Sequence, residues 1–333
     1  MRKPILARIA AVATAVPPGI LSNKDLEKMV ETNDQWIVER TGIRQRHIVE
    51  KGVTSSDLGA EAASKVLKKA NLDPKDVDLI IVATITPDMQ LPAIACLVQN
   101  KIGATNAWAF DVSAACSGFL YSLQVAVQFI ASGAHKNIIV VGVDVMSSII
   151  DYTDRSTCII FGDGGGAVLV QASESEADGC FLDFIHESDG SGGESLSLPG
   201  GGSKHPATHE TVDQKLHFVH QDGPAVFKFA TRKMAELAVK VLERNGLRGE
   251  DVDLFVPHQA NLRIIQSAVE RLKAPMEKVI VNIDEFGNTT AGTLPIALNS
   301  AIEQGRLKKG DLVLMASMGA GFTAGAAIFR WGY

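Results

Sequence analysis

Several features that mark particular classes of protein are scarce or absent in this 333-residue sequence. Aromatic residues make up only 6%, and positive charge is in deficit, with a formal net charge of −6. A negative balance without blocks of like charge argues against nucleic acid as the main ligand. No apolar run approaches the ~20 residues that a membrane-spanning helix needs. We therefore expect a globular protein that binds neither nucleic acid nor a membrane.

Cysteine is also scarce, with four residues in the whole chain and no CxxC pair among them. The four are widely separated, at Cys96, Cys116, Cys158 and Cys180. In a chain of this length, such spacing is typical of reduced thiols and not of a disulfide framework. The pattern predicts a cytoplasmic protein.

The N-terminus superficially resembles a secretory signal. Arg2 and Lys3 precede an apolar stretch, Pro4 to Val16. Arg8 interrupts this stretch, and turn residues beginning at Pro17 follow it. These two features favour an opening β-strand over a signal peptide.

The sequence does contain an internal repeat. Lys65–Leu67 and Asp76–Leu79 precede one apolar strand, and the same residue pattern, Lys240–Leu242 and Asp251–Leu254, precedes another. The offset is the same in both cases (240 − 65 = 251 − 76 = 175). An ordered series of matches at one offset indicates a duplicated core.

The repeat extends further along each half. A helix end closed by glycine and followed by an apolar strand occurs at Gly133 and again at Gly305. Strands such as Leu79–Ala83 and Ile138–Val141 are continuously apolar, as expected when a sheet is covered on both faces. Alternating strands and helices in two copies predict a layered α/β architecture.

The boundary between the copies falls near residue 175, which gives halves of residues 1–175 and 176–333. Within the second half, Ser188–Gln221 is polar, rich in glycine and without periodic pattern. We interpret it as a long surface excursion whose role the sequence does not indicate.

Cys116 carries the sharpest local chemical signal. The apolar strand Trp108–Val112 leads into small residues, then Cys116, then a long apolar helix from about Phe119 to Ala131. Small neighbours permit a sharp turn that places the thiol at a helix N-terminus, where unsatisfied N–H groups and the helix dipole favour thiolate. This context favours a nucleophile over an inert buried cysteine, the interpretation that suits Cys96 and Cys158.

Two further polar residues follow predicted strands. His258 comes after Leu254–Val256 and opens onto a helix, and Asn288 comes after Val279–Ile283. Carboxyl ends of strands are where α/β sheets hold ligands. Taken alone, however, the histidine could be a buried core residue with its hydrogen bonds made within the protein. Gly-Asn-Thr could simply form a turn.

Two other patterns do not predict binding sites. The glycine-rich run Gly162–Gly166 lacks the Lys-Ser/Thr ending of a phosphate loop. Four histidines lie in the polar excursion without nearby cysteine ligands, so we expect no metal site there. They are His205, His209, His217 and His220.

Taken together, the sequence resembles the β-ketoacyl-acyl-carrier-protein synthase III family, the initiating condensing enzymes of bacterial fatty-acid synthesis. The resemblance covers essentially the whole chain. It is carried by Thr32–Ile37 with Arg40–Ile43, Asp111–Phe119, Asp154-Arg155 with Phe161–Gly164, His258–Arg263, Gly287–Thr289 and Gly319–Thr323. The family implies a duplicated thiolase-like fold with five layers, α-β-α-β-α, and a homodimer.

The resemblance also implies roles for individual residues. The catalytic Cys–His–Asn triad falls on Cys116, His258 and Asn288, and the oxyanion donors on the backbone N–H groups of Cys116 and Ala320. Ala320 replaces a glycine that is frequent in the family, which need not matter for a backbone donor. Leu91 matches a position that helps close the acyl pocket across the dimer.

Coenzyme A binding in the family maps onto seven positions of this chain. They are Thr32, Trp36, Arg40, Arg155, Phe227, Asn261 and Arg263. The Trp and Arg side chains suit stacking on adenine and pairing with phosphate. Four basic residues could receive an acidic carrier protein or could simply form a solvated face. They are Lys228, Arg232, Lys233 and Arg263.

The implied reaction is a decarboxylative Claisen condensation of an acyl-CoA primer, with acetyl-CoA expected, and malonyl-acyl-carrier protein. It proceeds through acyl-Cys116 and requires no metal or other cofactor. The alternatives are a related enzyme that takes longer or branched acyl-CoA in secondary metabolism, and a cysteine hydrolase that releases free acid. A degradative thiolase fits less well, because Gly319–Thr323 lacks a second cysteine. A non-catalytic acyl-binding protein is the simplest alternative.

Overall fold

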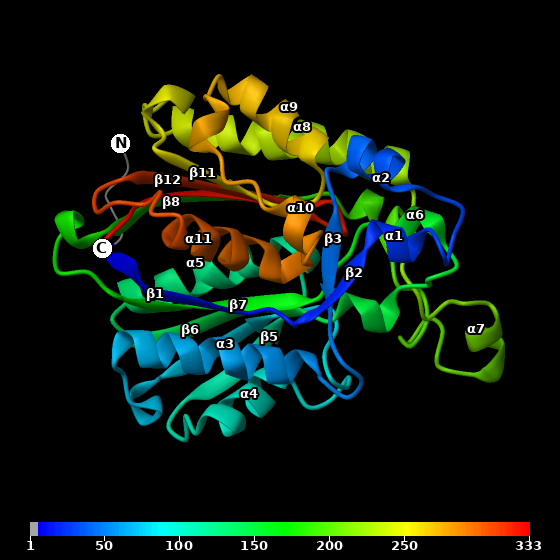
Figure 1. Cartoon of the computed structure of the whole chain (residues 1–333). Helices are drawn as coiled ribbons and strands as arrows, with labels where there is room; N and C mark the ends of the chain where they lie inside the picture. The colour runs from blue at the N-terminus through cyan, green and yellow to red at the C-terminus, as the bar shows by residue number, and fades with distance from the viewer. Residues whose placement is uncertain (1–5) are drawn as a thin grey trace.

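The computed structural model describes residues 6–333, which form five layers of helices and sheets (Figure 1). From one side to the other these are two helices, a sheet, two central helices, a second sheet and two more helices. The helices of the outer and central layers are α8 (Gly223–Glu243) and α9 (Leu262–Leu272), α5 (Gly118–Ala131) and α11 (Thr293–Glu303), and α3 (Ser55–Ala70) and α4 (Ile94–Ile102). The five-layered thiolase-like fold is therefore confirmed.

The N-terminal sheet has five strands in the order β1-β7-β6-β4-β5. They are β1 (Ala7–Ala15), β4 (Leu79–Ala83), β5 (Trp108–Val112), β6 (Asn137–Asp144) and β7 (Gly164–Ala172). Strands β5, β4 and β6 are parallel, so their carboxyl ends meet at one edge of the sheet. That edge carries the segment that contains Cys116.

The C-terminal sheet repeats this arrangement with one strand fewer, in the order β11-β12-β13-β8. The strands are β8 (Cys180–Ser188), β11 (Leu254–Pro257), β12 (Leu312–Gly319) and β13 (Thr323–Arg330). The starts of β11 and β12 follow those of β4 and β6 at the offset of the sequence repeat (254 − 79 = 312 − 137 = 175). The first sheet ends at Ala172 and the second begins at Cys180, while the domain division at residue 175 stays a prediction.

The C-terminal half has no strand equivalent to β5, and the predicted strand Val279–Ile283 is wrong. Val279 makes only an isolated bridge to Phe255, and Ile283 begins the short helix α10 (Ile283–Phe286). The side chain of Gln259 replaces the missing ladder, because its Nε2 donates to the Ile280 carbonyl (3.1 Å) and its Oε1 accepts from the Asn282 N–H (3.1 Å). A polar side chain thus satisfies backbone groups that a strand would otherwise need.

The central helices are apolar on most of their surface because both sheets cover them. α5 contains no charged residue, and Phe119, Leu120 and Leu123 have no exposed surface. Burying each such side chain contributes roughly 1.5–3 kcal/mol. This dense packing fixes the start of α5, and with it the turn that bears Cys116.

The outer helices are amphipathic and have well-defined ends. On α3, Thr54 and Asp57 form a capping box at the start, and Asn71 adopts the left-handed conformation at the end. On α8, the Asp222 side chain accepts a hydrogen bond from the Ala225 N–H (3.1 Å). These helices bury one face against the outer side of each sheet and hold its strands in place.

Shorter elements surround one end of the layers. They are β2 (Gly19–Ser22), β3 (Gln45–Ile48), α1 (Asn23–Leu26), α2 (Asp34–Thr41), α6 (Arg155–Cys158), β9 (Leu196–Ser197), α7 (His209–Asp213) and β10 (His220–Gln221). The last three lie in Ser188–Gln221, so this excursion is not patternless, contrary to the sequence interpretation. β9 and β10 pair with each other, and α7 lies at the tip of the protruding loop (Figure 1).

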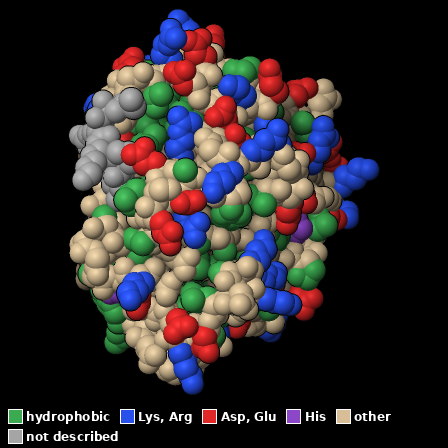
Figure 2. All heavy atoms as spheres, turned by 90° about the vertical axis from the view of Figure 1, so that its left-hand side faces the viewer, with side chains coloured by type: hydrophobic (Ala, Val, Ile, Leu, Met, Phe, Trp, Pro, Cys, Tyr) green, Lys and Arg blue, Asp and Glu red, His purple; other side chains and the backbone are tan. Residues whose placement is uncertain are grey.

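The surface that Figure 2 shows has acidic and basic side chains interspersed, with no block of one sign. Within residues 6–333, no helix is both long and apolar enough to cross a membrane. The expected opening strand is confirmed as β1, whereas Arg2 and Lys3 lie outside the described residues.

Candidate active site

Cys116 lies in a tight turn between β5 and α5. The turn is a single 3₁₀ turn, η2 (Ala115–Ser117), and Ala115 has a positive φ of 46°. The hydroxyl of Ser317, on β12, donates to the Cys116 carbonyl (2.7 Å). The turn is therefore held both by the helix that follows it and by the other half of the molecule.

Gly319 at the end of β12 approaches the same turn closely. A Cβ atom at this position would lie 2.8 Å from the Cys116 backbone nitrogen, closer than non-bonded atoms tolerate. Glycine thus leaves space in front of the Cys116 N–H group. That N–H group is one of the two oxyanion donors that the family resemblance implies.

The thiol of Cys116 is less acidic than the sequence predicts. Complete burial raises its pKa to about 12, and the nearby carboxylate of Asp144 adds to the effect. Removal from water disfavours the charged form and so opposes the stabilisation of thiolate that the helix N-terminus predicts.

His258 follows β11, and its backbone N–H donates to the Ala316 carbonyl (2.8 Å), which extends the pairing with β12. Its side chain is 1% exposed, and neither ring nitrogen has a hydrogen-bond partner among the described residues. Burial lowers the pKa of the imidazole to about 3, so the ring is neutral at physiological pH. A neutral imidazole offers one N–H donor and one acceptor nitrogen to a ligand.

Asn288 follows α10 and is anchored through its backbone to the N-terminal half. Its N–H donates to the Ile160 carbonyl and its carbonyl accepts from the Gly162 N–H, both at 3.0 Å. Its side-chain Oδ1 accepts a hydrogen bond from the Thr290 N–H (2.9 Å). With Oδ1 used in this way, the Nδ2–H group is what Asn288 presents to a ligand.

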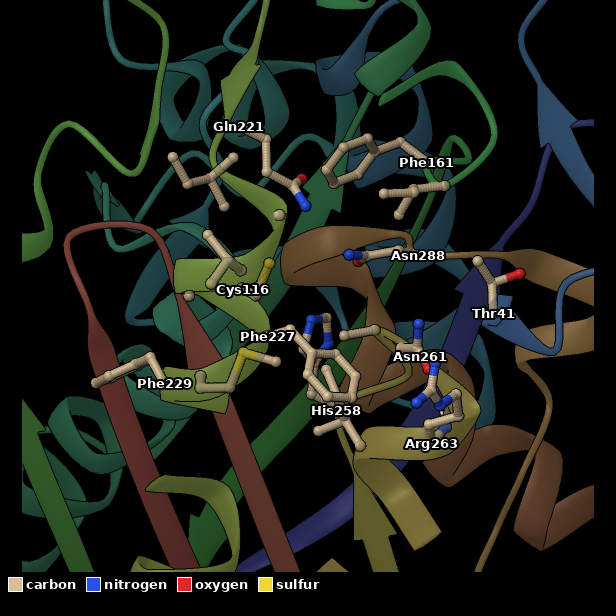
Figure 3. A pocket seen from close by; sticks show the side chains of 18 of the residues that line it. Thr41, Cys116, Phe161, Gln221, Phe227, Phe229, His258, Asn261, Arg263 and Asn288 are labelled. Atoms are coloured by element: carbon tan, nitrogen blue, oxygen red, sulfur yellow. Dashed lines mark hydrogen bonds between the residues drawn. The ribbon is translucent and has the colours of Figure 1, made fainter. Parts of the chain in front are cut away.

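The structure brings these three residues together. Cys116, His258 and Asn288 line one cavity of 420 Å³, and their side chains point toward a common space (Figure 3). They come from three different elements that the duplicated core places at the same end of its two sheets. A thiol and two side chains able to donate hydrogen bonds thus face the same cavity.

The outer part of this cavity is lined by four of the residues predicted to bind coenzyme A, namely Arg40, Phe227, Asn261 and Arg263. The guanidinium of Arg263 lies over the Phe227 ring, 5.3 Å from its centroid. Asn261 caps α9 and donates to the Arg40 carbonyl (2.9 Å), which links the start of α9 to α2. Cations and an aromatic ring at the cavity mouth suit an anionic, nucleotide-bearing ligand.

The other three predicted residues, Thr32, Trp36 and Arg155, do not line this cavity, but Trp36 contacts Arg40, which does. The guanidinium groups of Arg40 and Arg155 lie 5.7 and 5.1 Å from the centroid of the Trp36 ring. Arg155 also donates to the Glu31 carbonyl (2.9 Å), which brings α6 against the segment before α2. The Thr32 hydroxyl is buried without a partner among the described residues.

A second cavity of 480 Å³ also reaches Cys116, from its other side. Its lining is mostly apolar and includes residues that no sequence pattern indicated. They are Ile85, Pro87, Met146, Ile149, Leu196, Leu198 and Val219. Three of these lie within Ser188–Gln221, so the excursion forms part of a cavity wall. Sequence reasoning missed them because the lining comes from segments that are far apart in the chain.

Two predicted residues occupy different positions around this second cavity. Ala320 contributes to its lining, next to the turn that bears Cys116. Leu91 does not line it and is 84% exposed on the segment before α4. The closure that the resemblance implies for Leu91 would therefore require a second copy of the chain.

The remaining sequence predictions concern cysteines, histidines and the glycine run. All four cysteines are free, but Cys96 is exposed, contrary to its interpretation as a buried residue. No group of three or more potential ligands for a metal occurs within residues 6–333. His217 instead contacts the Thr211 hydroxyl (2.9 Å). Gly164 begins β7, so the last three glycines of the run belong to that strand.

Comparisons with known proteins agree along the whole chain. A family model described as 3-oxoacyl-[acyl-carrier-protein] synthase III matches residues 110–190, and one described as its C terminal matches residues 242–331. The beta-ketoacyl-[acyl-carrier-protein] synthase III of Koribacter versatilis is 59% identical over 327 residues, which are 98% of each chain.

Solved structures show the same likeness. The 3-oxoacyl-[acyl-carrier-protein] synthase III of Aquifex aeolicus has a TM-score of 0.90 at 44% identity, covering 98% of this chain and 100% of the other. The priming beta-ketosynthase of the R1128 polyketide biosynthetic pathway has a TM-score of 0.91 at 32% identity, covering 99% and 98%.

Proposed function

Because this chain belongs to the β-ketoacyl-acyl-carrier-protein synthase III family, we propose that its condensation reaction runs through an acyl thioester on Cys116. The chain is an acyl-transferring condensing enzyme of fatty-acid biosynthesis. One observation carries the proposed role of Cys116: its thiol, His258 and Asn288 line a single cavity whose mouth is cationic.

In the first half-reaction, the Cys116 sulfur attacks the carbonyl carbon of an acyl-CoA. The thiol is protonated in the free protein, so its proton must leave as the sulfur attacks. The neutral ring of His258 has an acceptor nitrogen in the same cavity and can pass this proton to the departing coenzyme A sulfur. Backbone N–H groups of Cys116 and Ala320 stabilise the oxyanion that forms in between.

In the second half-reaction, malonyl-carrier protein delivers its thioester to the same cavity. Loss of carbon dioxide places negative charge on the thioester oxygen, where His258 and Asn288 donate hydrogen bonds. The carbanion attacks the acyl-Cys116 carbonyl, which releases the β-ketoacyl product and leaves Cys116 as a thiolate. The thiolate takes up one proton from solvent to restore the thiol. Each well-placed donor is worth roughly 100- to 1,000-fold in rate. Two transfers through one covalent intermediate predict ping-pong kinetics.

The coenzyme A moiety is proposed to lie at the outer part of the cavity. Thr32, Trp36 and Arg155 would receive its adenine end, with Arg40 and Arg263 near the phosphates, and Phe227 and Asn261 along the channel. The geometry supports this, because three cationic side chains already lie over aromatic faces there. Coenzyme A is then a substrate, and we propose that the reaction needs no metal or other cofactor. Full activity after dialysis against a chelator would support that point.

A homodimer also belongs to the proposal. β5 is an edge strand of the five-stranded sheet, and Trp108 on it is 48% exposed. Leu91, at 84%, projects from a neighbouring segment and suits insertion into the second cavity of a partner copy. The cytoplasmic location that the sequence predicts likewise remains a proposal, supported by four free cysteines.

The carrier protein would approach over α8 and α9. Lys228 and Arg232 line a shallow groove there together with Arg271. Lys233 is already engaged by Glu187 (2.7 Å) and Glu236 (3.1 Å), so it does not belong to the proposed docking surface. Arg232→Glu tests this docking surface. We expect this variant to bind malonyl-carrier protein more weakly while its acylation by acyl-CoA is unchanged.

The alternative primer is a longer or branched acyl group. The second cavity is large for an acetyl group, and the structural likeness to a priming polyketide β-ketosynthase keeps this alternative open. Rates with acetyl-CoA and with a series of longer and branched acyl-CoAs would decide between the two.

The test of the proposed function compares condensation with hydrolysis. Purified protein is given acyl-CoA, with and without malonyl-carrier protein, and products are quantified by mass spectrometry. We expect β-ketoacyl-carrier protein and carbon dioxide only when both substrates are present. Release of free acid at the same rate without the malonyl donor would instead identify a hydrolase.

A further inference from the structure

Asp144, at the carboxyl end of β6, is a fully buried carboxylate that the proposed reaction does not use. One of its oxygens, Oδ1, accepts four hydrogen bonds from the segment that follows β4. The donors are the hydroxyl groups of Thr84 and Thr86 (both 2.9 Å) and the backbone N–H groups of Ile85 (2.8 Å) and Thr86 (3.1 Å). Burial raises the pKa of this carboxyl group, and the hydrogen bonds that it accepts oppose that shift. This side of the carboxylate is therefore fixed within the N-terminal half.

The other oxygen reaches across to the C-terminal half. Oδ2 accepts hydrogen bonds from the Thr290 hydroxyl and from the Ala291 N–H (3.1 Å). Both donors belong to a one-turn 3₁₀ helix, η8 (Thr290–Gly292), in which Thr290 has a positive φ of 48°. A β-branched residue is strained in this conformation, so its side-chain contacts must hold it there.

The next contact leads directly to the active site. The Thr290 N–H donates to Oδ1 of Asn288 (2.9 Å), which fixes the orientation of the side-chain amide. The backbone of Asn288 is separately tied to residues 160 and 162. An unbroken chain of hydrogen bonds thus runs from Asp144 through Thr290 to the amide that the proposed mechanism uses.

The duplicated fold shows what is unusual about this carboxylate. Ala291 and Gly319 are the counterparts of Cys116 and Asp144 in the other half, because the offset of the repeat separates each pair (291 − 116 = 319 − 144 = 175). Gly319 leaves open the space in front of the Cys116 N–H, where the oxyanion is proposed to lie. In the other copy, the Asp144 carboxylate accepts the Ala291 N–H. A resident anion thus fills the equivalent of the oxyanion site.

We propose that Asp144 is a positioning residue for the decarboxylation step, which through Thr290 aims the Nδ2–H group of Asn288 at the malonyl thioester oxygen. The proposal rests on the role of Asn288 in the proposed function. Asp144 does not touch substrate, and its effect is transmitted by the fixed geometry of η8.

The same carboxylate has an opposite effect on the nucleophile. After burial, its negative charge is the second cause that raises the pKa of Cys116. Removing the charge should therefore leave acylation by acyl-CoA unimpaired or make it faster, while it slows decarboxylation. A residue that only held the fold together would impair both half-reactions.

The experiment compares Thr290→Val with Thr290→Ser. Valine keeps the size and branching of threonine but lacks the hydroxyl that Asp144 accepts, whereas serine keeps that hydroxyl. Acylation is followed by intact-protein mass spectrometry after mixing with acetyl-CoA. Decarboxylative condensation is followed by rapid quenching after pre-acylated enzyme meets malonyl-carrier protein.

We expect Thr290→Val to slow condensation at least about tenfold, because a misaligned donor loses part of its roughly 100- to 1,000-fold contribution. The acylation rate should stay within about threefold of that of the unmodified enzyme, so that only the condensation step is clearly slowed. Thr290→Ser should retain most of the condensation rate. Asp144→Asn should show the same split between half-reactions, and circular dichroism verifies its fold.

Equal condensation rates in Thr290→Val and Thr290→Ser would overturn the proposal, as would a parallel loss of both half-reactions. If Asp144→Asn does not fold, the isosteric Thr290 pair decides the question. Asn288→Ala separates the role of Asn288 from that of Asp144. Fast condensation by pre-acylated Asn288→Ala would refute the role of Asn288 itself, whereas slow Asn288→Ala with fast Thr290→Val would refute only the role of Asp144.

Discussion

In both halves of the molecule, a one-turn 3₁₀ helix with one residue at positive φ precedes the central helix. Ala115 (φ 46°) stands before α5 and Thr290 (φ 48°) before α11, and the offset of the repeat again separates them (290 − 115 = 175). The last residue of a strand in each half lies against the turn of the other half: Gly319 of β12 against η2, and Asp144 of β6 against η8. The backbone is therefore duplicated almost residue for residue around the active site.

The two copies differ in what occupies the space beside the turn. In one copy, Gly319 has no side chain to fill the space beside the N–H of Cys116. In the other, Asp144 accepts a hydrogen bond from the equivalent N–H of Ala291. In the proposed mechanism, the first copy of the turn is the reaction site and the second supports Asn288.

The largest expected effect comes from removing the nucleophile from the reactive turn. Cys116→Ala should abolish acylation by acyl-CoA and lower condensation by roughly 10⁴-fold or more. The measurement is the mass of the intact protein after incubation with acetyl-CoA. Cys96→Ala, at the exposed cysteine, is the matched control, and a mass increase that persists in Cys116→Ala would place the acyl group elsewhere.

The next effect concerns His258 and Asn288, which the C-terminal half contributes. His258→Ala and Asn288→Ala should each slow decarboxylative condensation roughly 100- to 1,000-fold, because each removes one donor to the developing negative charge. Asn288→Ala should still become acylated, which intact-mass measurement would verify. Undiminished carbon dioxide release from malonyl-carrier protein by Asn288→Ala would contradict the role assigned to its amide.

A third change makes the two copies more alike. Gly319→Ala places a methyl group near the Cys116 nitrogen, where a Cβ would lie at 2.8 Å. We expect acylation to slow by about 10- to 100-fold, because the methyl group obstructs one oxyanion donor. Gly202→Ala is the control, since a Cβ there meets no atom within 4 Å. Equal acylation rates in the two variants would show that this N–H group is not needed.

The pH dependence of alkylation tests how strongly burial affects the reactive turn. Because the pKa of Cys116 is raised to about 12, its thiol is almost entirely protonated at pH 8. The rate of alkylation by iodoacetamide should therefore keep rising up to at least about pH 10, without the plateau that an ordinary thiol reaches above its pKa of ~8.5. The measurement is made in Cys96→Ser, and a plateau below pH 9 would mean that the thiolate is stabilised after all.

The smallest expected effect concerns the segment before α4. Leu91→Ala should shift the preference between acetyl-CoA and longer acyl-CoAs by roughly tenfold, the scale of one or two methylene groups in an apolar pocket. Competition between two acyl-CoAs for acylation measures this ratio directly. An unchanged ratio would indicate that Leu91 takes no part in closing the acyl cavity, in either copy of a dimer.

Much of this fold could be predicted from the sequence, because its signals are local or periodic. The repeat at a constant offset indicated the duplicated core, and the long apolar stretch from Phe119 to Ala131 predicted α5 almost to its ends. The small residues around Cys116 predicted its sharp turn. These features depend on neighbours within a few positions, which the sequence lists in order.

Other features depend on contacts between distant segments and could not be predicted. The side chain of Gln259 bonds to the backbone at residues 280 and 282, where a strand was predicted, and burial raises the pKa of Cys116. Asp144 and Thr290 are separated by 146 residues, and neither belongs to a recognisable motif. An acidic residue that ends an otherwise apolar strand was the one available signal.

The most direct test of the proposed mechanism is to locate the acyl group and follow its fate. The protein is incubated with isotopically labelled acetyl-CoA, and a quenched sample is digested and mapped by mass spectrometry. We predict that the label is on the peptide that contains Cys116, and that adding malonyl-carrier protein transfers it into a β-ketoacyl product. Label on Cys96, or loss of the label to water as free acid before any malonyl donor is added, would contradict the mechanism.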